Sequence, residues 1–250
     1  MEEDKFIEIV SQDERFFTEF DNLNQLINTN INKYKIIFSF KDNEFLIQYY
    51  INDLLTITFN AFRTTNLNKS HNISFDLTFN NSLSLYGLPL RMTELSLKPT
   101  DKENGYRLFN LDCAEQIPGH YQSLYGSIPI VHSLQTEGNH ITSVFFHNPS
   151  DTWIDISFEK NNDKSLRYVS EGGIINLYLY SDSNFDRLFY KQSLITGFSK
   201  LPPIFSLGYH QCRWSYMNQV EVNDLITNFD KYEIPYDVIW LDIDVTVIFT

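Results

Sequence analysis

Residues 201–244 constrain the fold most, because they are predicted to form a strand, a helix and a second strand in succession. The short apolar run 204–209 predicts the first strand, and the run 236–243, apolar on both faces apart from two aspartates, predicts the second. The helix between them is indicated by apolar residues that recur at i, i+3, i+4 and i+7: Val222, Leu225, Ile226 and Phe229. Apolar strands on either side of a helix are typical of a parallel sheet covered by helices.

Polar and aromatic side chains gather at the C-terminal ends of both predicted strands. His210, Arg213 and Trp214 follow the first strand, and Asp242 lies in the second. In a (β/α)8 barrel this end of the strands builds the active site. The segment therefore predicts the first βαβ unit of such a barrel.

The preceding residues have a different pattern, in which short apolar runs alternate with polar turns. They predict strands at 7–10, 34–40, 45–51, 54–59, 75–79, 83–86, 107–110, 128–132, 141–147, 153–159 and 174–180. Asn52 and Asp53 predict a hairpin turn between two of these strands. Many short strands with regular turns favour a β-sandwich.

A helix over residues 185–195 is expected to link the two parts. Ser183 is its predicted N-cap, and Gly197 its predicted C-terminal stop. Its buried stripe is predicted to consist of Phe185, Leu188, Phe189 and Ile195. The expected organisation is thus a β-sandwich domain over 1–180, a linking helix over 181–200 and an incomplete barrel over 201–250.

These sequence blocks carry a resemblance to a known family. LPPIFSLGYHQCRW, followed about thirty residues later by PYDVIWLDID, resembles the opening of the catalytic barrel of glycoside hydrolase family 31. SFDLTFNNSLSLYGLPLRM, YRLFNLDCAEQ and LYGSIPIV resemble the β-rich domain that precedes that barrel. The resemblance implies a mainly β protein with a galactose-mutarotase-like sandwich, and retaining α-glucosidase activity without a cofactor.

The resemblance also implies which residues bind sugar. Asp242 matches the carboxylate that accepts hydrogen bonds from hydroxyls of the terminal glucose, and Trp214 matches an aromatic residue lining the same pocket. Asp112 matches a loop aspartate that reaches over the barrel mouth. Arg213 and His210 belong to the same block and are expected to support the pocket, either by direct contact or as interior residues that only pair with their neighbours.

No catalytic residue is assigned. A retaining glycosidase needs two carboxyl groups about 5–5.5 Å apart, and the family nucleophile lies in a Trp-x-Asp-Met-Asn-Glu stretch that the 250 residues do not contain. The polypeptide by itself is therefore expected to be inactive. The chain also has Leu90-Arg91 where family members carry an acidic residue and a histidine, so no pocket role is assigned to that loop.

The composition of the chain excludes several classes of binding partner. A net charge of −13 argues against a nucleic-acid or anionic-membrane partner. No metal-ligand spacing occurs, no run is apolar enough to span a membrane, and the acidic N-terminus has no signal-peptide core. Two cysteines, Cys113 and Cys212, are too few for a disulfide framework; free thiols and a single bridge are both open. The resemblance implies an endoplasmic-reticulum lumenal protein that acts on α-glucosides or glucosylated N-glycans, with a regulatory β subunit as a partner.

Two hypotheses for function remain open at this point. The chain is part of a family 31 α-glucosidase, or it is a non-catalytic carbohydrate-binding or scaffold protein built on the same β domain.

Overall fold

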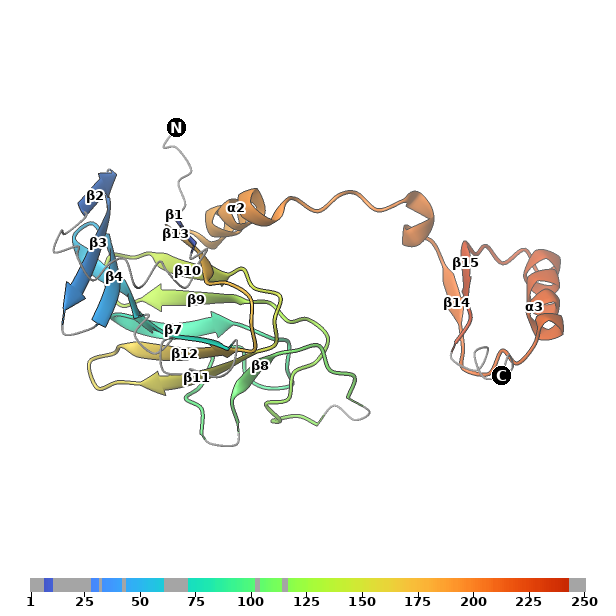
Figure 1. Ribbon diagram of the computed structural model, residues 1–250. Helices are drawn as coiled ribbons and strands as arrows, with labels where there is room; N and C mark the ends of the chain where they lie inside the picture. The colour runs from blue at the N-terminus through green and yellow to red at the C-terminus, as the bar shows by residue number, and fades with distance from the viewer. Residues whose placement is uncertain are drawn as a thin grey trace. The chain divides into compact units, whose positions relative to one another are not determined.

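The computed structural model describes residues 7–10, 28–31, 33–41, 44–60, 72–101, 104–113 and 117–242 (Figure 1). The chain divides into two compact units, Met1–Thr196 and Gly197–Thr250, and each is described by itself. None of the helices among the described residues is long and apolar enough to cross a membrane.

The first unit contains two antiparallel sheets. Eight strands form the larger sheet, in the order β2 (Asn28–Ile31), β3 (Tyr34–Lys41), β4 (Glu44–Ile51), β5 (Leu54–Asn60), β6 (Ile73–Phe79), β12 (Lys164–Ser170), β11 (Thr152–Phe158) and β8 (Tyr106–Leu108). Five strands form the smaller sheet, in the order β1 (Ile7–Val10), β13 (Asn176–Asp182), β10 (Ile141–Phe146), β9 (Ile130–Gln135) and β7 (Ser82–Gly87).

The core lies between the two sheets and is rich in aromatic rings. Phe75 on β6 stacks on Tyr168 of β12, with ring centroids 4.6 Å apart, and meets Phe146 of β10 edge-on at 5.1 Å. Leu177 and Leu179 of β13 belong to the same buried cluster. Side chains from both sheets therefore close one apolar layer, which makes this unit a β-sandwich.

All eleven predicted strands are present, with bounds shifted by a few residues. The predicted hairpin between β4 and β5 is confirmed, since Ile51 pairs with Leu54 and both turn residues, Asn52 and Asp53, have positive φ (49° and 63°).

Strand β12 was not predicted from the sequence. Its inward residues include only two apolar side chains, because Lys164 and Ser170 point inward at its ends. Lys164 is buried and its ammonium group donates to the carbonyl of Ser82, while burial lowers its pKa. Because a polar residue lies at each end of its inner face, the sequence of β12 lacks the alternation of apolar and polar residues that predicts a strand.

Helix α2 (Phe185–Thr196) follows β13, as the sequence predicts, but its cap and its buried face differ from the prediction. Asn184 is the N-cap, not Ser183, because the Asn184 side-chain oxygen accepts from the backbone N–H of Asp186 at 2.6 Å. Gly197 follows the helix with φ of +88°, which suits the predicted stop.

Only Leu188 of the predicted α2 stripe is fully buried, against Ile141 and Tyr180 of the smaller sheet. Phe185 and Phe189 are 42% and 47% exposed. The second buried residue of the helix is Lys191, whose ammonium group lies 2.9 Å from the carboxylate of Asp182 on β13. An ion pair, which apolar periodicity cannot reveal, therefore helps to set the helix orientation.

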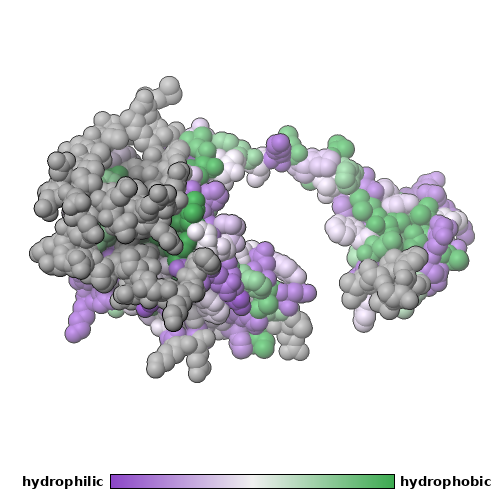
Figure 2. Space-filling view, in the orientation of Figure 1, coloured by the Kyte–Doolittle hydropathy of each residue, from purple (hydrophilic) through white to green (hydrophobic). Residues whose placement is uncertain are grey.

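The second unit contains a 3-10 helix η3 (Ile204–Leu207), strand β14 (His210–Cys212), helix α3 (Gln219–Lys231) and strand β15 (Val238–Trp240). The two strands pair in parallel, His210 with Val238 and Cys212 with Trp240, so the predicted βαβ unit is confirmed. Figure 2 shows hydrophobic residues gathered on the visible face of this unit. Leu207 and Leu241 are among its exposed apolar residues.

The prediction of a strand at 204–209 was wrong, because residues 204–207 form η3 and the strand begins only at His210. Pro203 precedes η3 in an extended conformation, and its carbonyl accepts from both the backbone N–H and the hydroxyl of Ser206. His210 consequently lies in the strand instead of after it. The second strand is also shorter than predicted, and Asp242 lies two residues beyond its end.

Candidate functional site

The loop that carries Asp112 is fastened to a second loop by one asparagine. Asn110 Oδ1 accepts hydrogen bonds from the backbone N–H groups of Gly126 and Ser127, at 3.1 and 3.0 Å, and from the Ser127 hydroxyl at 3.0 Å. Asp112 itself is exposed, and its carboxylate lies beside Tyr125, which is 61% exposed. Partial desolvation, the charge of Asp112 and a hydrogen bond to it together raise the pKa of Tyr125. The two joined loops thus present the Asp112 carboxylate and the Tyr125 phenol to solvent.

A neighbouring loop is organised by Arg91. Its guanidinium donates to the carbonyls of Gly87 and Pro89 at 3.1 Å and of Glu94 at 3.1 Å, and it lies over the ring of Tyr106, 4.9 Å from the centroid. Desolvation by burial lowers the pKa of Arg91. No pocket role was assigned to this loop from the sequence. The contacts of Arg91 are with backbone carbonyls of the loop itself, so Arg91 holds the loop in shape.

Backbone pairing joins these loops into one layer. Leu90 donates to the carbonyl of Gly126 and accepts from the N–H of Leu124, both at 2.9 Å. A side chain at Gly126 would lie 2.7 Å from Leu90 Cδ1, and Gly126 has φ of +122°. The turn at residues 125–127 therefore needs its glycine for both conformation and space.

In the second unit, Arg213 and Trp214 follow β14 directly. The Arg213 guanidinium lies 3.3 Å from the carboxylate of Glu221 on α3 and 4.7 Å from the ring centroid of the buried Tyr216. Trp214 points to solvent and is 69% exposed. Arg213 thus ties the segment that carries Trp214 to the start of α3.

Glu221 is a residue that the sequence reasoning missed. Asn218 caps α3 by accepting from the backbone N–H of Glu221 at 3.0 Å, and the Glu221 carboxylate accepts from the N–H of Met217 at 3.2 Å. The signal was available, since Asn218 and Glu221 have the spacing of a capping box. The same carboxylate serves both the cap and Arg213.

His210 and Trp240 meet across the two parallel strands. The indole N–H of Trp240 donates to Nδ1 of His210 at 2.8 Å, and the other ring nitrogen, Nε2, is buried with no partner among the residues that the structure describes. Asp242 follows β15 and is half-buried. His210 therefore lies at the N-terminal end of the strand pair, whereas Arg213, Trp214 and Asp242 follow its C-terminal end.

The arrangement suits recognition of a neutral, hydroxyl-rich ligand. Carboxylates accept hydrogen bonds from hydroxyl groups, and exposed aromatic rings cover the apolar face of a sugar. Asp112 belongs to the first unit, whereas Trp214 and Asp242 belong to the second, so their convergence on one pocket stays a prediction. In the described part of the chain no three His, Cys, Asp or Glu side chains cluster as metal ligands, and Cys113 and Cys212 are free thiols.

Comparison with protein families gives two matches in sequence order. Residues 2–155 match the glycosyl hydrolase 31 N-terminal galactose mutarotase-like domain, and residues 199–250 match the glycosyl hydrolases family 31 TIM-barrel domain. The mainly β fold with a mutarotase-like sandwich and a barrel start, which the sequence predicts, is thereby confirmed.

The chain is similar to curated α-glucosidases. It is 36% identical to Glucosidase 2 subunit alpha of Saccharomyces cerevisiae over 199 residues, covering 76% of this chain and 20% of that protein. It is also 36% identical to Neutral alpha-glucosidase AB of Dictyostelium discoideum over 195 residues, covering 75% and 20%. The chain thus spans about a fifth of the length of these relatives.

Solved structures of similar fold give the same family. The glucosidase II alpha subunit in its DNJ-bound form superposes with a TM-score of 0.70 at 26% identity, covering 85% of this chain and 27% of that one. The ER glucosidase II heterodimeric complex of catalytic subunit and regulatory-subunit binding domain gives 0.69 at 26% identity, covering 85% and 28%. Since the family match covers more than half of its residues, the chain belongs to glycoside hydrolase family 31.

Proposed function

We propose that this chain supplies the β-sandwich and the first βαβ unit of a retaining α-glucosidase that removes terminal α-linked glucose from oligosaccharides or N-glycans. The observation that carries the proposal is the pair of family matches, at residues 2–155 and 199–250. The similarity to proteins named glucosidase 2 subunit alpha supports the same substrate class.

In this proposal Asp242, Trp214 and Asp112 hold the terminal glucose. Asp242 accepts hydrogen bonds from glucose hydroxyls, and a carboxylate that accepts two of them reads the sugar's stereochemistry. Trp214 covers the apolar face of the ring, and Asp112 approaches from the β-domain loop that Asn110 fastens. Arg213 and His210 act as supports, through Glu221 and Trp240.

The nucleophile and the acid/base are assigned to barrel residues outside this sequence. We also place the protein in the endoplasmic-reticulum lumen with a regulatory subunit as partner. The support is the similar solved complex, which contains a catalytic subunit and the binding domain of a regulatory subunit.

A chimera tests the proposal. This chain would replace the matching region of the S. cerevisiae relative, and hydrolysis of an aryl α-glucoside would be measured. The chimera is expected to be active, while the 250-residue chain alone is expected to show no turnover, because it lacks the assigned carboxyl pair. Asp242→Asn in the chimera should lower kcat/KM by at least about tenfold, since a hydrogen bond to a charged group contributes roughly 1.5–3 kcal/mol.

Asp224→Asn, on the exposed face of α3, is the matched control and should leave kcat/KM unchanged. A folded chimera without activity, or one whose activity survives Asp242→Asn, would contradict the proposal. The first of these results would favour the alternative, a non-catalytic carbohydrate-binding protein.

A further inference from the structure

The outer face of the eight-stranded sheet forms an open groove of about 530 Å³. The groove crosses β4, β5, β6, β12 and β11, strands whose order in the sheet is continuous. Nine of its eleven lining residues are polar, so it does not continue the apolar core: Thr58, Asn60, Asp76, Thr78, Asp155, Ser157, Glu159, Ser165 and Arg167.

Two rows of these residues run across the strands in register. Asp155 on β11 stands opposite Arg167 on β12, which stands opposite Asp76 on β6, which stands opposite Asn60 on β5. Neighbouring strands lie about 4.8 Å apart, so this charged row spans roughly 14 Å, the length of two to three sugar rings.

The second row carries only hydroxyl groups. Ser157, Ser165, Thr78 and Thr58 occupy the adjacent outward position on the same four strands. Thr78 and Ser165 are hydrogen-bonded to each other at 2.9 Å, although they are 87 residues apart in the sequence. Thr58 donates to Asn80 Oδ1 and Ser157 donates to Glu159 Oε1, so protein partners orient the hydroxyl groups of this polar floor.

The charge pattern selects against charged ligands. Among the residues that the structure describes, none is in hydrogen-bond or ion-pair contact with the Arg167 guanidinium, which has an aspartate on each side in the cross-strand register. A cationic side chain would meet Arg167 at the centre of the row, and an anion would meet the flanking carboxylates. Each ligand type would meet a like charge in this geometry, whereas a neutral polyol can accept from the Arg167 guanidinium and donate to the Asp155 carboxylate, which also accepts from the Thr100 hydroxyl at 3.3 Å.

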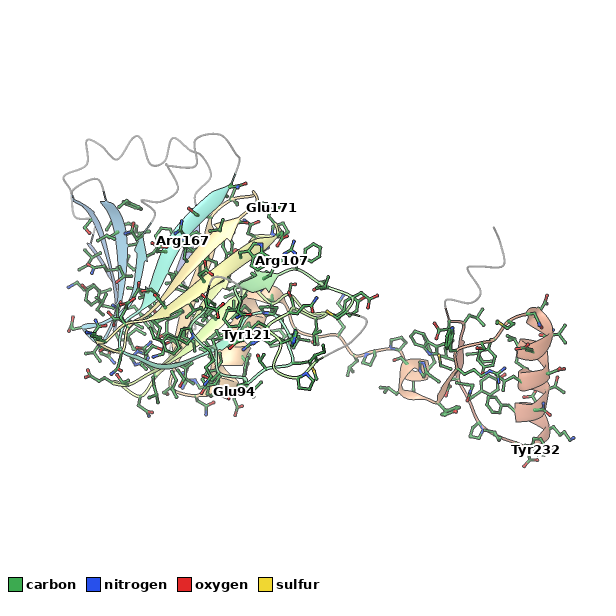
Figure 3. The ribbon with its side chains drawn as sticks, turned by 90° about the horizontal axis from the view of Figure 1, so that it is seen from below. Glu94, Arg107, Tyr121, Arg167, Glu171 and Tyr232 are labelled. Atoms are coloured by element: carbon green, nitrogen blue, oxygen red, sulfur yellow. The ribbon has the colours of Figure 1, made fainter. Side chains whose placement is uncertain are left out.

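An exposed tryptophan borders the groove. Trp153 lies on β11 two residues before Asp155 and is 44% exposed. A Cβ at Gly105 would lie 3.2 Å from the Trp153 ring and 3.3 Å from the Asp155 carboxylate, which places the two side chains beside one another. Arg107 lies 5.2 Å from the Trp153 ring centroid and is itself paired with Asp151, so the ring is supported (Figure 3 labels Arg107 and Arg167).

We propose that this groove binds a neutral oligosaccharide, with Trp153 as the stacking platform and Asp155 and Arg167 as the pair that binds its hydroxyl groups. The site lies wholly within the β-sandwich and uses none of the residues assigned above to the glucose pocket.

The proposal can be tested by following the NMR resonances of the indole N–H groups of the three tryptophans. Maltotetraose is titrated into the ¹⁵N-labelled 250-residue chain, and the resonances of Trp153, Trp214 and Trp240 are assigned by single Trp→Phe substitutions. The expected result is a saturable shift of the Trp153 resonance. Arg167→Ala and Asp155→Asn should each weaken this binding by about tenfold or more, the ratio expected for a lost hydrogen bond to a charged group.

Lys200→Ala, an exposed substitution outside the sandwich, is the control and should leave the titration unchanged. The proposal is overturned if the Trp153 resonance does not move with maltotetraose, or if both variants, with otherwise native spectra, bind as the parent does. It is also overturned if tetralysine shifts Trp153 more strongly than the sugar, which would indicate a basic peptide. Shifts of Trp214 or Trp240 report on the barrel segment, so failure of this proposal and of the proposed function are separable.

Discussion

The indole N–H of Trp240 donates to Nδ1 of His210 over 2.8 Å, across the parallel pair β14–β15. An indole can only donate, so Nδ1 must be the unprotonated nitrogen, and the neutral ring carries its proton on Nε2. This contact fixes the tautomer of a histidine that lies three residues before Arg213 in the chain.

Trp240→Phe is expected to remove this constraint. The free energy of unfolding of the second unit should fall by about 1 kcal/mol, because one hydrogen bond is lost at a partly exposed position. The ¹⁵N shifts of the His210 ring should move from a pure Nε2–H tautomer toward a mixture. Trp214→Phe, which alters an exposed ring, serves as the control; an unchanged His210 spectrum in Trp240→Phe would contradict the assignment.

Gly208→Ala is expected to disrupt the entry to β14. A Cβ at this position would lie 1.8 Å from Asp237 Oδ2, which is far inside van der Waals contact, although the φ of −84° suits any residue. Hydrogen exchange of the β14 and β15 amides should therefore accelerate, whereas amides of the β-sandwich should not change.

The double variant Gly208→Ala, Asp237→Ala distinguishes a steric clash with Asp237 from an effect on the backbone conformation of residue 208. Removing the carboxylate should restore much of the protection, because the clash is with that side chain. Equal disruption in the single and double variants would show that Asp237 is not the obstacle.

His132 should make the first unit sensitive to mild acid. It lies on β9, where its Nδ1 is 2.7 Å from the Ser143 hydroxyl and its ring meets Phe189 of α2 edge-on. Burial lowers its pKa from 6.5 to about 4, so the unfolded chain binds the proton more readily than the folded one. The stability from keeping His132 neutral is complete above pH 6.5 and is lost as the pH falls toward 4.

Urea denaturation between pH 7 and 4.5 measures this effect, and the expected loss is on the order of 2–3 kcal/mol. His132→Gln should flatten the pH dependence over this window. His120→Gln, at an exposed loop position, is the control and should leave the profile as it is.

Asn110→Ala is expected to loosen the loop that presents Asp112 and Tyr125. Three hydrogen bonds to residues 126 and 127 disappear, and the free energy of unfolding should fall by about 1–3 kcal/mol. Exchange of the Gly126 and Ser127 amides should rise most. Asn104→Ala, which removes a side chain that donates to the Asp101 carboxylate at the surface, is the control. Equal protection of residues 126 and 127 in both variants would refute the role of Asn110.

Local sequence determined the elements that depend on near neighbours. Asn52-Asp53 predicts the β4–β5 turn because few other residues tolerate positive φ at two successive positions. The i, i+3, i+4, i+7 pattern around Phe229 predicts α3 because the helix buries one stripe. The residues of the family blocks, Asp242 and Trp214 among them, were recognisable for the same reason, since each block is short and continuous.

Tertiary structure decided what depends on residues far apart in the chain. Strand β12 escaped prediction because Lys164 is buried through a hydrogen bond to Ser82, a partner 82 residues away. The groove rows exist only because β6 and β12 become neighbours and bring Thr78 to within 2.9 Å of Ser165. Alternation along each strand marks which side chains face outward, but only the pairing of strands determines which of them meet.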